Sequence, residues 1–181
     1  MTVFLKKNRI HILIWAMMFV YIISAPRLHT NFFLKQGRPI AVSRSIPAET
    51  DQIKLNVDAL DLIVQDRQEV YLLWGWAFST LDPSLSPDMY EREILLISPS
   101  QKVYAFSIDT VSRPGVQEFF KDLNMNLTES GFSTLISKDV LPVGEYRIGI
   151  VLRDPSTGLS YYTDKPKRIL LRTPNSLSLL K

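Results

Sequence analysis

Histidine and cysteine are the side chains that most often carry proton exchange and nucleophilic attack near neutral pH. The chain of 181 residues has no cysteine, and its two histidines, His11 and His29, both lie near the N-terminus. A Ser-His-Asp triad, a thiolate zinc site and a cysteine nucleophile are therefore excluded from the region beyond Thr50. No Gly-rich phosphate-binding loop is present either. We expect no catalytic residue, no cofactor and no metal site.

Four acidic side chains gather around a segment rich in proline and serine: Asp82, Asp88, Glu91 and Glu93. Carboxylates are ligands for calcium, which takes six or more oxygen atoms. No spaced calcium-loop motif is present here, so a solvated acidic loop is the favoured interpretation.

Arg113 stands directly before Pro114 and has two interpretations. Its planar guanidinium could bind an anionic ligand, or it could form a structural salt bridge or contact a backbone carbonyl. The structural role is the favoured one.

The strongest local pattern is Trp74-Gly75-Trp76, in which two tryptophans at i and i+2 share one face of a strand. Such a pair could form a platform that stacks on sugar rings, or an anchor in a core between two sheets. Apolar residues occupy the rest of that face between residues 70 and 78, so the core interpretation is favoured. Tyr104 is the third candidate for a ligand-binding or core aromatic residue.

Strands must position these residues, because the sequence from about Asp51 onward alternates with a period of two. The segments with this pattern or with short apolar runs are 53–57, 70–78, 93–97, 103–108, 132–136, 145–152, 159–163 and 168–171. Turn residues such as Pro, Gly, Asp and Ser separate them. The spacing predicts a mainly β domain, an antiparallel β-sandwich of the Ig-like type.

One segment departs from this pattern. Pro114 begins a run in which a first-turn proline suits a short helix. Val116, Phe119, Phe120 and Leu123 would then lie on one side of it.

An apolar run, residues 10–25, precedes the β-rich region. As a helix it spans about 24 Å, close to the ~30 Å of a hydrocarbon core. Lys6, Lys7 and Arg9 precede it, and this asymmetry predicts a cytoplasmic N-terminus. We therefore expect one N-terminal transmembrane helix, an uncleaved signal-anchor.

A cleaved signal peptide is the alternative, since it has the same basic and apolar regions. Cleavage after Ala25 would place Ile23 at position −3 and Pro26 at +1, and both are unfavourable. The uncleaved anchor is the favoured interpretation.

The predicted organisation has five parts. Residues 1–9 form the cytoplasmic N-terminus, 10–25 the anchor, 26–50 a linker, 51–173 the β-sandwich and 174–181 a C-terminal tail. The protein is expected in the cell membrane as a single-pass protein with its domain outside the cytoplasm.

Charge argues against a nucleic-acid partner. Three of the 21 basic residues precede the apolar run, which leaves 18 basic residues against 18 acidic ones. A domain that binds phosphate backbones needs a basic face, and this balance does not supply one.

Several motifs together resemble a recurring extracytoplasmic β-sandwich domain of prokaryotic membrane proteins associated with cell-surface polysaccharides. They are Leu73–Phe78 (LWGWAF), Arg113–Val116 (RPGV), Ser130–Phe132 (SGF) and Gly144–Ile150 (GEYRIGI). In that family the second motif usually reads Arg-Pro-Asp-Val, whereas this chain has Gly115. The resemblance implies a fold and a location, but no activity and no catalytic residues.

The expected function is a non-catalytic, membrane-tethered interaction or accessory module. A carbohydrate-binding module of a cell-surface polysaccharide system is one alternative, and a single-helix structural subunit of a larger membrane complex is another. The expected partners are the lipid bilayer and either membrane proteins or polysaccharides.

Overall fold

A computed structural model describes residues 37–42, 45–65 and 68–180 of the chain. Within these ranges the protein is mainly β, with antiparallel strands, as the alternating sequence predicts. The predicted anchor, residues 10–25, and the predicted cytoplasmic N-terminus, residues 1–9, lie outside the described residues. Among the described residues, none belongs to a helix long and apolar enough to cross a membrane.

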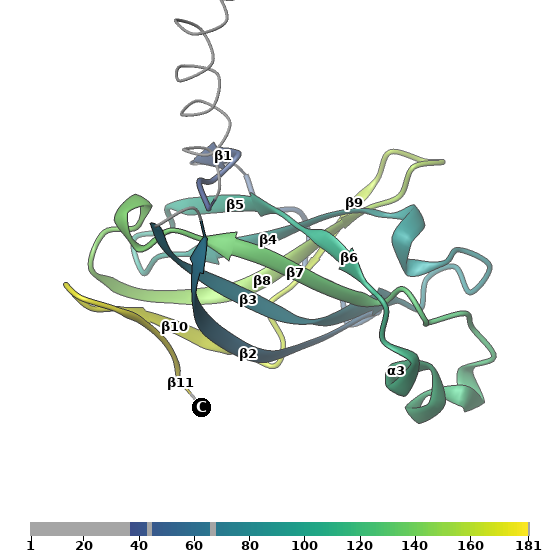
Figure 1. The fold of residues 1–181 in the computed structure, drawn as a ribbon. Helices are drawn as coiled ribbons and strands as arrows, with labels where there is room; N and C mark the ends of the chain where they lie inside the picture. Colours follow the sequence, from purple (N-terminus) through teal and green to yellow (C-terminus); the bar gives the residue numbers. More distant parts are fainter. Residues whose placement is uncertain (1–36, 43–44, 66–67, 181) are drawn as a thin grey trace, which may run out of the picture. The chain divides into compact units, whose positions relative to one another are not determined.

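Two antiparallel sheets make up the domain (Figure 1). The first, here called the β8 sheet, has the order β1-β5-β4-β8-β10-β11, and β9 pairs with β8. Its strands are β1 (Ala41–Val42), β4 (Glu91–Ile97), β5 (Val103–Ser107), β8 (Gly144–Arg153), β9 (Ser160–Thr163), β10 (Ile169–Arg172) and β11 (Leu177–Leu180).

The second, the β3 sheet, has the order β2-β3-β7-β6. Its strands are β2 (Ile53–Gln65), β3 (Gln68–Ser79), β6 (Asp109–Val111) and β7 (Gly131–Ile136). Short helices connect the strands: α3 (Pro114–Phe119) and the 3₁₀ turns η1 (Pro87–Met89), η2 (Lys121–Leu123) and η3 (Lys138–Val140). Figure 1 shows α3 beyond the end of β6 and β1 beside β5.

The main hydrophobic core lies between the two sheets, which is the arrangement of a β-sandwich. The β3 sheet contributes Ile53, Leu55, Val57, Tyr71, Leu73, Ala77, Phe132 and Ile136. The strands β4, β5 and β8 contribute Ile94, Leu96, Tyr104, Phe106, Tyr146, Ile148, Ile150 and Leu152. Alternate residues of each strand point into this core, which explains the period of two in the sequence.

The tryptophans of β3 do not lie in this core, so the prediction that they anchor it is wrong. Trp74 and Trp76 are half-buried on the outer face of the β3 sheet, while Leu73 and Ala77 point inward. Both faces of this strand are apolar, and the sequence alone does not show which face meets the other sheet. Tyr104, in contrast, is a core residue with 4% of its surface exposed.

A bulge in β2 changes which residues of that strand face outward. Val57 pairs with Gly75 and Ala59 pairs with Trp74, so Asp58 is an extra residue without a partner in the ladder. Such bulges bend a strand and redirect a side chain. Asp58 lies on the outer face, as Asn56 does, and the bulge brings Ala59 to the same face, where it pairs with Trp74.

The outer face of the β8 sheet is also apolar and is covered by the segment that precedes β2. The buried residues of this face are Leu95, Ile97, Val103, Ala105, Val151 and Tyr162, and Ala41 and Ile46 pack against them. The Thr50 amide donates a hydrogen bond to the Tyr162 carbonyl over 2.8 Å. This face is therefore a second, smaller core.

The domain is longer at both ends than the sequence predicts. The predicted linker, residues 26–50, contains β1 and the covering segment, and the Gly37 carbonyl accepts a hydrogen bond from the Ser137 amide. The predicted tail, residues 174–181, contains β11, which pairs with β10. Strands of two to four residues show too little alternation to be recognised from sequence.

Candidate ligand-binding site

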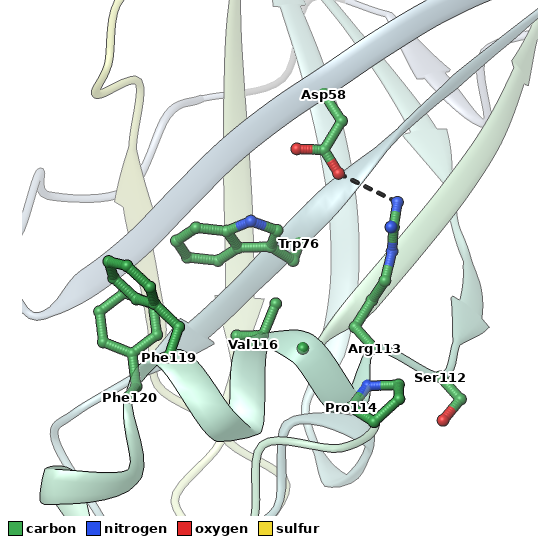
Figure 2. A pocket seen from close by; sticks show the side chains of 9 residues that line it. Asp58, Trp76, Ser112, Arg113, Pro114, Val116, Phe119 and Phe120 are labelled. Carbon is green, nitrogen blue, oxygen red and sulfur yellow. Dashed lines mark hydrogen bonds and ion pairs between the residues drawn. The ribbon is translucent and has the colours of Figure 1, made fainter.

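A cavity of about 500 Å³ lies on the outer face of the β3 sheet, between this sheet and α3 (Figure 2). We call it the α3 pocket. It is lined by Asp58, Trp76, Ser112, Arg113, Pro114, Gly115, Val116, Phe119 and Phe120. This volume falls in the range of small-molecule binding sites.

The helix that forms one wall begins at Pro114, as the sequence predicts, and ends at Phe119. Val116 is buried in a small cluster with Phe78, Met125 and Leu127, which holds α3 against the sheet. The prediction that Phe119 shares this buried side is wrong, because Phe119 exposes 79% of its surface. The helix is too short for its apolar residues to form a single buried stripe.

Three aromatic rings make the apolar wall. Phe120 meets Trp76 edge to face with 5.5 Å between ring centroids, and it meets Phe119 in the same way at 4.8 Å. Such edge contacts are favourable arrangements of aromatic rings. They fix Trp76 and Phe120 while leaving the Phe119 ring exposed to solvent.

An ion pair makes the polar wall. Arg113 Nη2 donates to Asp58 Oδ2 over 3.0 Å, and Asn56 Nδ2 donates to Asp58 Oδ1 over 2.5 Å. The side chains of Arg113 and Asp58 keep about a quarter of their surfaces exposed. The predicted structural salt bridge of Arg113 is therefore confirmed. Figure 2 shows Trp76 between this ion pair and the two phenylalanines.

Arg113 is held in place from several directions. Its amide donates to the Thr128 carbonyl over 2.6 Å, and its guanidinium lies 4.5 Å from the centre of the Trp74 ring. A Cβ on Gly131 would come within 2.5 Å of Arg113 Cγ, so the glycine gives the arginine room to cross β7. Only a residue without a side chain at Gly131 leaves this path open.

The β6–β7 pair that carries Arg113 is itself fixed by a buried arginine. Arg92 in β4 is almost fully buried and donates to Thr110 Oγ1 over 2.7 Å and to the carbonyls of Ser130 and Gly131. Burial in this environment lowers the pKa of Arg92 below its usual value. A charge-assisted link between the two sheets therefore supports one end of the pocket.

Of the three aromatic candidates, the structure brings one into the pocket. Trp76 lines it. Trp74 is covered on one side by Arg113, and its indole nitrogen donates to Asp61 Oδ2 over 2.7 Å. Tyr104 packs edge to face on Tyr146 inside the sandwich, and its edge borders a separate hollow of about 350 Å³.

The acidic residues near the first long loop do not converge. Asp82 accepts hydrogen bonds from Ser84, Asp88 accepts one from Ser86, and Glu91 pairs with Arg153 over 3.3 Å. The Ser84 contacts lower the pKa of Asp82. No group of three or more potential metal ligands occurs among the described residues.

No protein-family model, curated protein or solved structure matches this chain. The resemblance to an extracytoplasmic β-sandwich family stays a prediction.

Asp58 and the exposed Phe119 are the site residues that sequence reasoning missed. Asp58 continues the polar face of β2 in sequence, and its partner Arg113 lies 55 positions away. The signal that could have found them is indirect: a carboxylate on an aromatic-rich sheet, and two adjacent phenylalanines on a helix too short to bury both.

Proposed function

We propose that the protein is a membrane-tethered interaction module that binds its partner in the α3 pocket outside the cytoplasm. The observation that carries this proposal is the position of the pocket along β3. The described domain begins at Gly37, whose carbonyl accepts a hydrogen bond from the amide of Ser137. The preceding residue, Ile136, pairs with Tyr71 of β3. Trp76 pairs with Gly131 at the other end of β3, about 17 Å further along the strand.

This position suits a tether. The chain enters the domain at one end, and the pocket opens near the other. Residues 26–36 separate the predicted anchor from Gly37, a length that reaches about 38 Å when extended.

The composition of the pocket favours binding over catalysis. Its two charged side chains, Asp58 and Arg113, neutralise each other, and no imidazole or thiol occurs beyond His29. A hydroxyl such as that of Ser112 needs an adjacent base to act as a nucleophile. The pocket offers recognition groups without this partner.

We also infer that the sandwich is of the Ig-like type. The supporting observation is Tyr146, near the start of β8, whose hydroxyl donates to the Pro142 carbonyl over 2.7 Å. A tyrosine that bonds back to the backbone a few residues upstream is the tyrosine corner of Greek-key sandwiches.

The absence of cysteine allows a direct test of the tether. Thr2→Cys and Leu159→Cys variants, each with one thiol, would be treated in spheroplasts with a maleimide that cannot cross membranes. Leu159 is 56% exposed, so its replacement should not disturb the fold. Labelling of position 159 alone before lysis, and of both positions after lysis, is the expected result. Early labelling of position 2 alone would reverse the proposed topology.

The module should work through its domain and not through its anchor sequence. Replacing residues 1–25 by an unrelated anchor is expected to preserve function, and the purified protein should show no turnover of polysaccharides, peptides or phosphoesters. Loss of function after the anchor swap would favour a subunit that packs through its helix. Turnover that one acidic substitution removes would identify an enzyme.

A further inference from the structure

We propose that the α3 pocket binds one uncharged sugar ring of an oligosaccharide or polysaccharide, with Trp76 and Phe119 as its apolar contacts and Asp58 and Arg113 as its hydroxyl contacts. This inference rests on the proposed function and names its ligand. The proposed contacts differ from the Trp74–Trp76 platform that the sequence suggested, because Arg113 covers one face of the Trp74 ring.

The two walls of the pocket match the two kinds of surface on a pyranose. The faces of such a ring carry C–H groups, whereas its edge carries hydroxyls that both donate and accept hydrogen bonds. Trp76 and Phe119 line the pocket, and their rings supply the aromatic surface for the C–H groups. Asp58 offers acceptor oxygens and Arg113 offers N–H donors to the hydroxyls.

Charge selects an uncharged ligand. The Asp58–Arg113 pair is neutral as a unit. The Asp58 carboxylate would repel an anion in the pocket, and the Arg113 guanidinium would repel a cation held by the aromatic rings. A purely apolar ligand would remove both charged groups from water without replacing their contacts, which is unfavourable.

The indole nitrogen of Trp76 adds a directional contact. It has no hydrogen-bond partner within the described part of the chain, and Figure 2 shows it on the edge of the ring toward Asp58. An indole N–H usually finds a partner when it becomes buried. A sugar hydroxyl placed between this N–H and the Asp58 carboxylate would accept from the first and donate to the second.

A proline-rich peptide is the main competing occupant, since such peptides dock in aromatic grooves. Its backbone carbonyls would accept from Trp76 and Arg113. Proline has no N–H, however, so a proline-rich segment offers few donors to the Asp58 carboxylate. Hydroxyl groups satisfy both members of the ion pair, and the observations therefore favour the sugar.

The test uses the full chain in lipid nanodiscs, because detergents with sugar head groups would compete for the pocket. Calorimetry would measure binding of neutral trisaccharides in the gluco, manno and galacto series, of trigalacturonic acid and of a decaproline peptide. At least one neutral trisaccharide should bind, and the acid and the peptide should not.

Three variants and a control locate the site. Phe119→Ala and Asp58→Asn should each weaken sugar binding by about tenfold or more, which corresponds to about 1.4 kcal/mol. Phe119→Tyr keeps an aromatic face and should bind within about twofold of the parent. Leu159→Ala, a change at another exposed apolar residue outside the pocket, should have no effect.

The outcomes separate this inference from the proposed function. If decaproline binds and no neutral sugar does, the inference of a sugar ligand is wrong, but the proposed function as an interaction module stands. Binding of trigalacturonic acid alone would identify an anion site and also overturn it. Hydrolysis of a bound neutral trisaccharide would keep the sugar and overturn the non-catalytic module. Absence of binding by every probe, or sugar binding unchanged in Phe119→Ala, would overturn the inference.

Discussion

The two outer faces of the sandwich have similar apolar compositions but different covers. On the β8 sheet, the segment around Ala41 and Ile46 closes over Leu95, Val151 and Tyr162, and these side chains are buried. On the β3 sheet, α3 covers Phe78 but leaves Trp76 half-buried and Phe119 exposed.

This difference shows that exposure of an aromatic residue depends on the segment that crosses its sheet. The segment that precedes β2 covers the first face, which therefore behaves as a core. A helix of six residues covers the second, and the space beside it is the α3 pocket. The closed face should respond to mutation as a core does, and the open face should respond mainly in ligand binding.

Truncation of one side chain on each face should give the largest difference. Leu95→Ala, at a fully buried position of the closed face, should lower the free energy of unfolding by about 3 kcal/mol. Trp74→Ala on the open face removes a half-buried ring, its hydrogen bond to Asp61 and its contact with Arg113. A loss of about 1–2 kcal/mol is expected for it.

Urea denaturation of both variants measures this contrast. A tryptophan in the inter-sheet core would lose about 3–5 kcal/mol of unfolding free energy on truncation to alanine. The loss expected for Trp74→Ala is smaller because Trp74 lies on the outer face. A larger loss for Trp74→Ala than for Leu95→Ala would mean that the β3 outer face is a closed core.

Glycine replacement provides a second contrast of the same kind. A Cβ on Gly149 would lie 2.4 Å from Tyr162 Cε2 and 3.0 Å from the Thr163 carbonyl, so Gly149→Ala should cost about 2 kcal/mol. A Cβ on Gly115, in α3, meets nothing within 4 Å. Gly115→Ala should therefore be neutral or stabilise the protein by up to about 1 kcal/mol, because alanine favours a helix. Equal melting temperatures for the two variants would remove the contrast.

The closed face should also give the protein a sensitivity to alkali. Burial raises the pKa of Tyr162 well above its usual value of 10.0, and Asp164 raises it further. The folded state keeps this phenol neutral while the unfolded chain ionises it. Its contribution is therefore complete below pH 10 and is lost as pH rises through the folded-state pKa.

A titration of melting temperature against pH tests this effect with Tyr162→Phe. The variant should lose less stability than the parent above pH 10, although burial also raises the pKa values of Tyr90 and Tyr146. Identical curves above pH 10 would show that Tyr162 ionises as easily in the folded protein as in the unfolded chain.

The regular strands could be predicted from the sequence because their alternation follows directly from burial on one side. In β8, Tyr146, Ile148 and Ile150 point into the core in turn, and the alternation appears in the sequence. The orientation of β3 could not be predicted, since Leu73 and Trp74 are both apolar and only the position of the β8 sheet decides that Leu73 lies in the core.

The candidate site was predictable in part. Trp76 and Arg113 stand out as residue types, and the salt bridge of Arg113 was the favoured interpretation. Asp58 could not be recognised, because it is one of several polar residues on the outward side of β2 and its partner Arg113 lies 55 positions away in the sequence. The exposure of Phe119 depends on where a six-residue helix ends. The ends of a helix are harder to predict from sequence than its existence.

Phe119→Ala tests the central claim that the α3 pocket is an open binding site and not part of the hydrophobic core. Both the free energy of unfolding and the affinity for the best neutral trisaccharide would be measured on the same preparation. The account predicts a change in stability within about 0.5 kcal/mol, because the ring is 79% exposed, together with about a tenfold loss of affinity. A loss of more than about 2 kcal/mol in stability with unchanged affinity would contradict it.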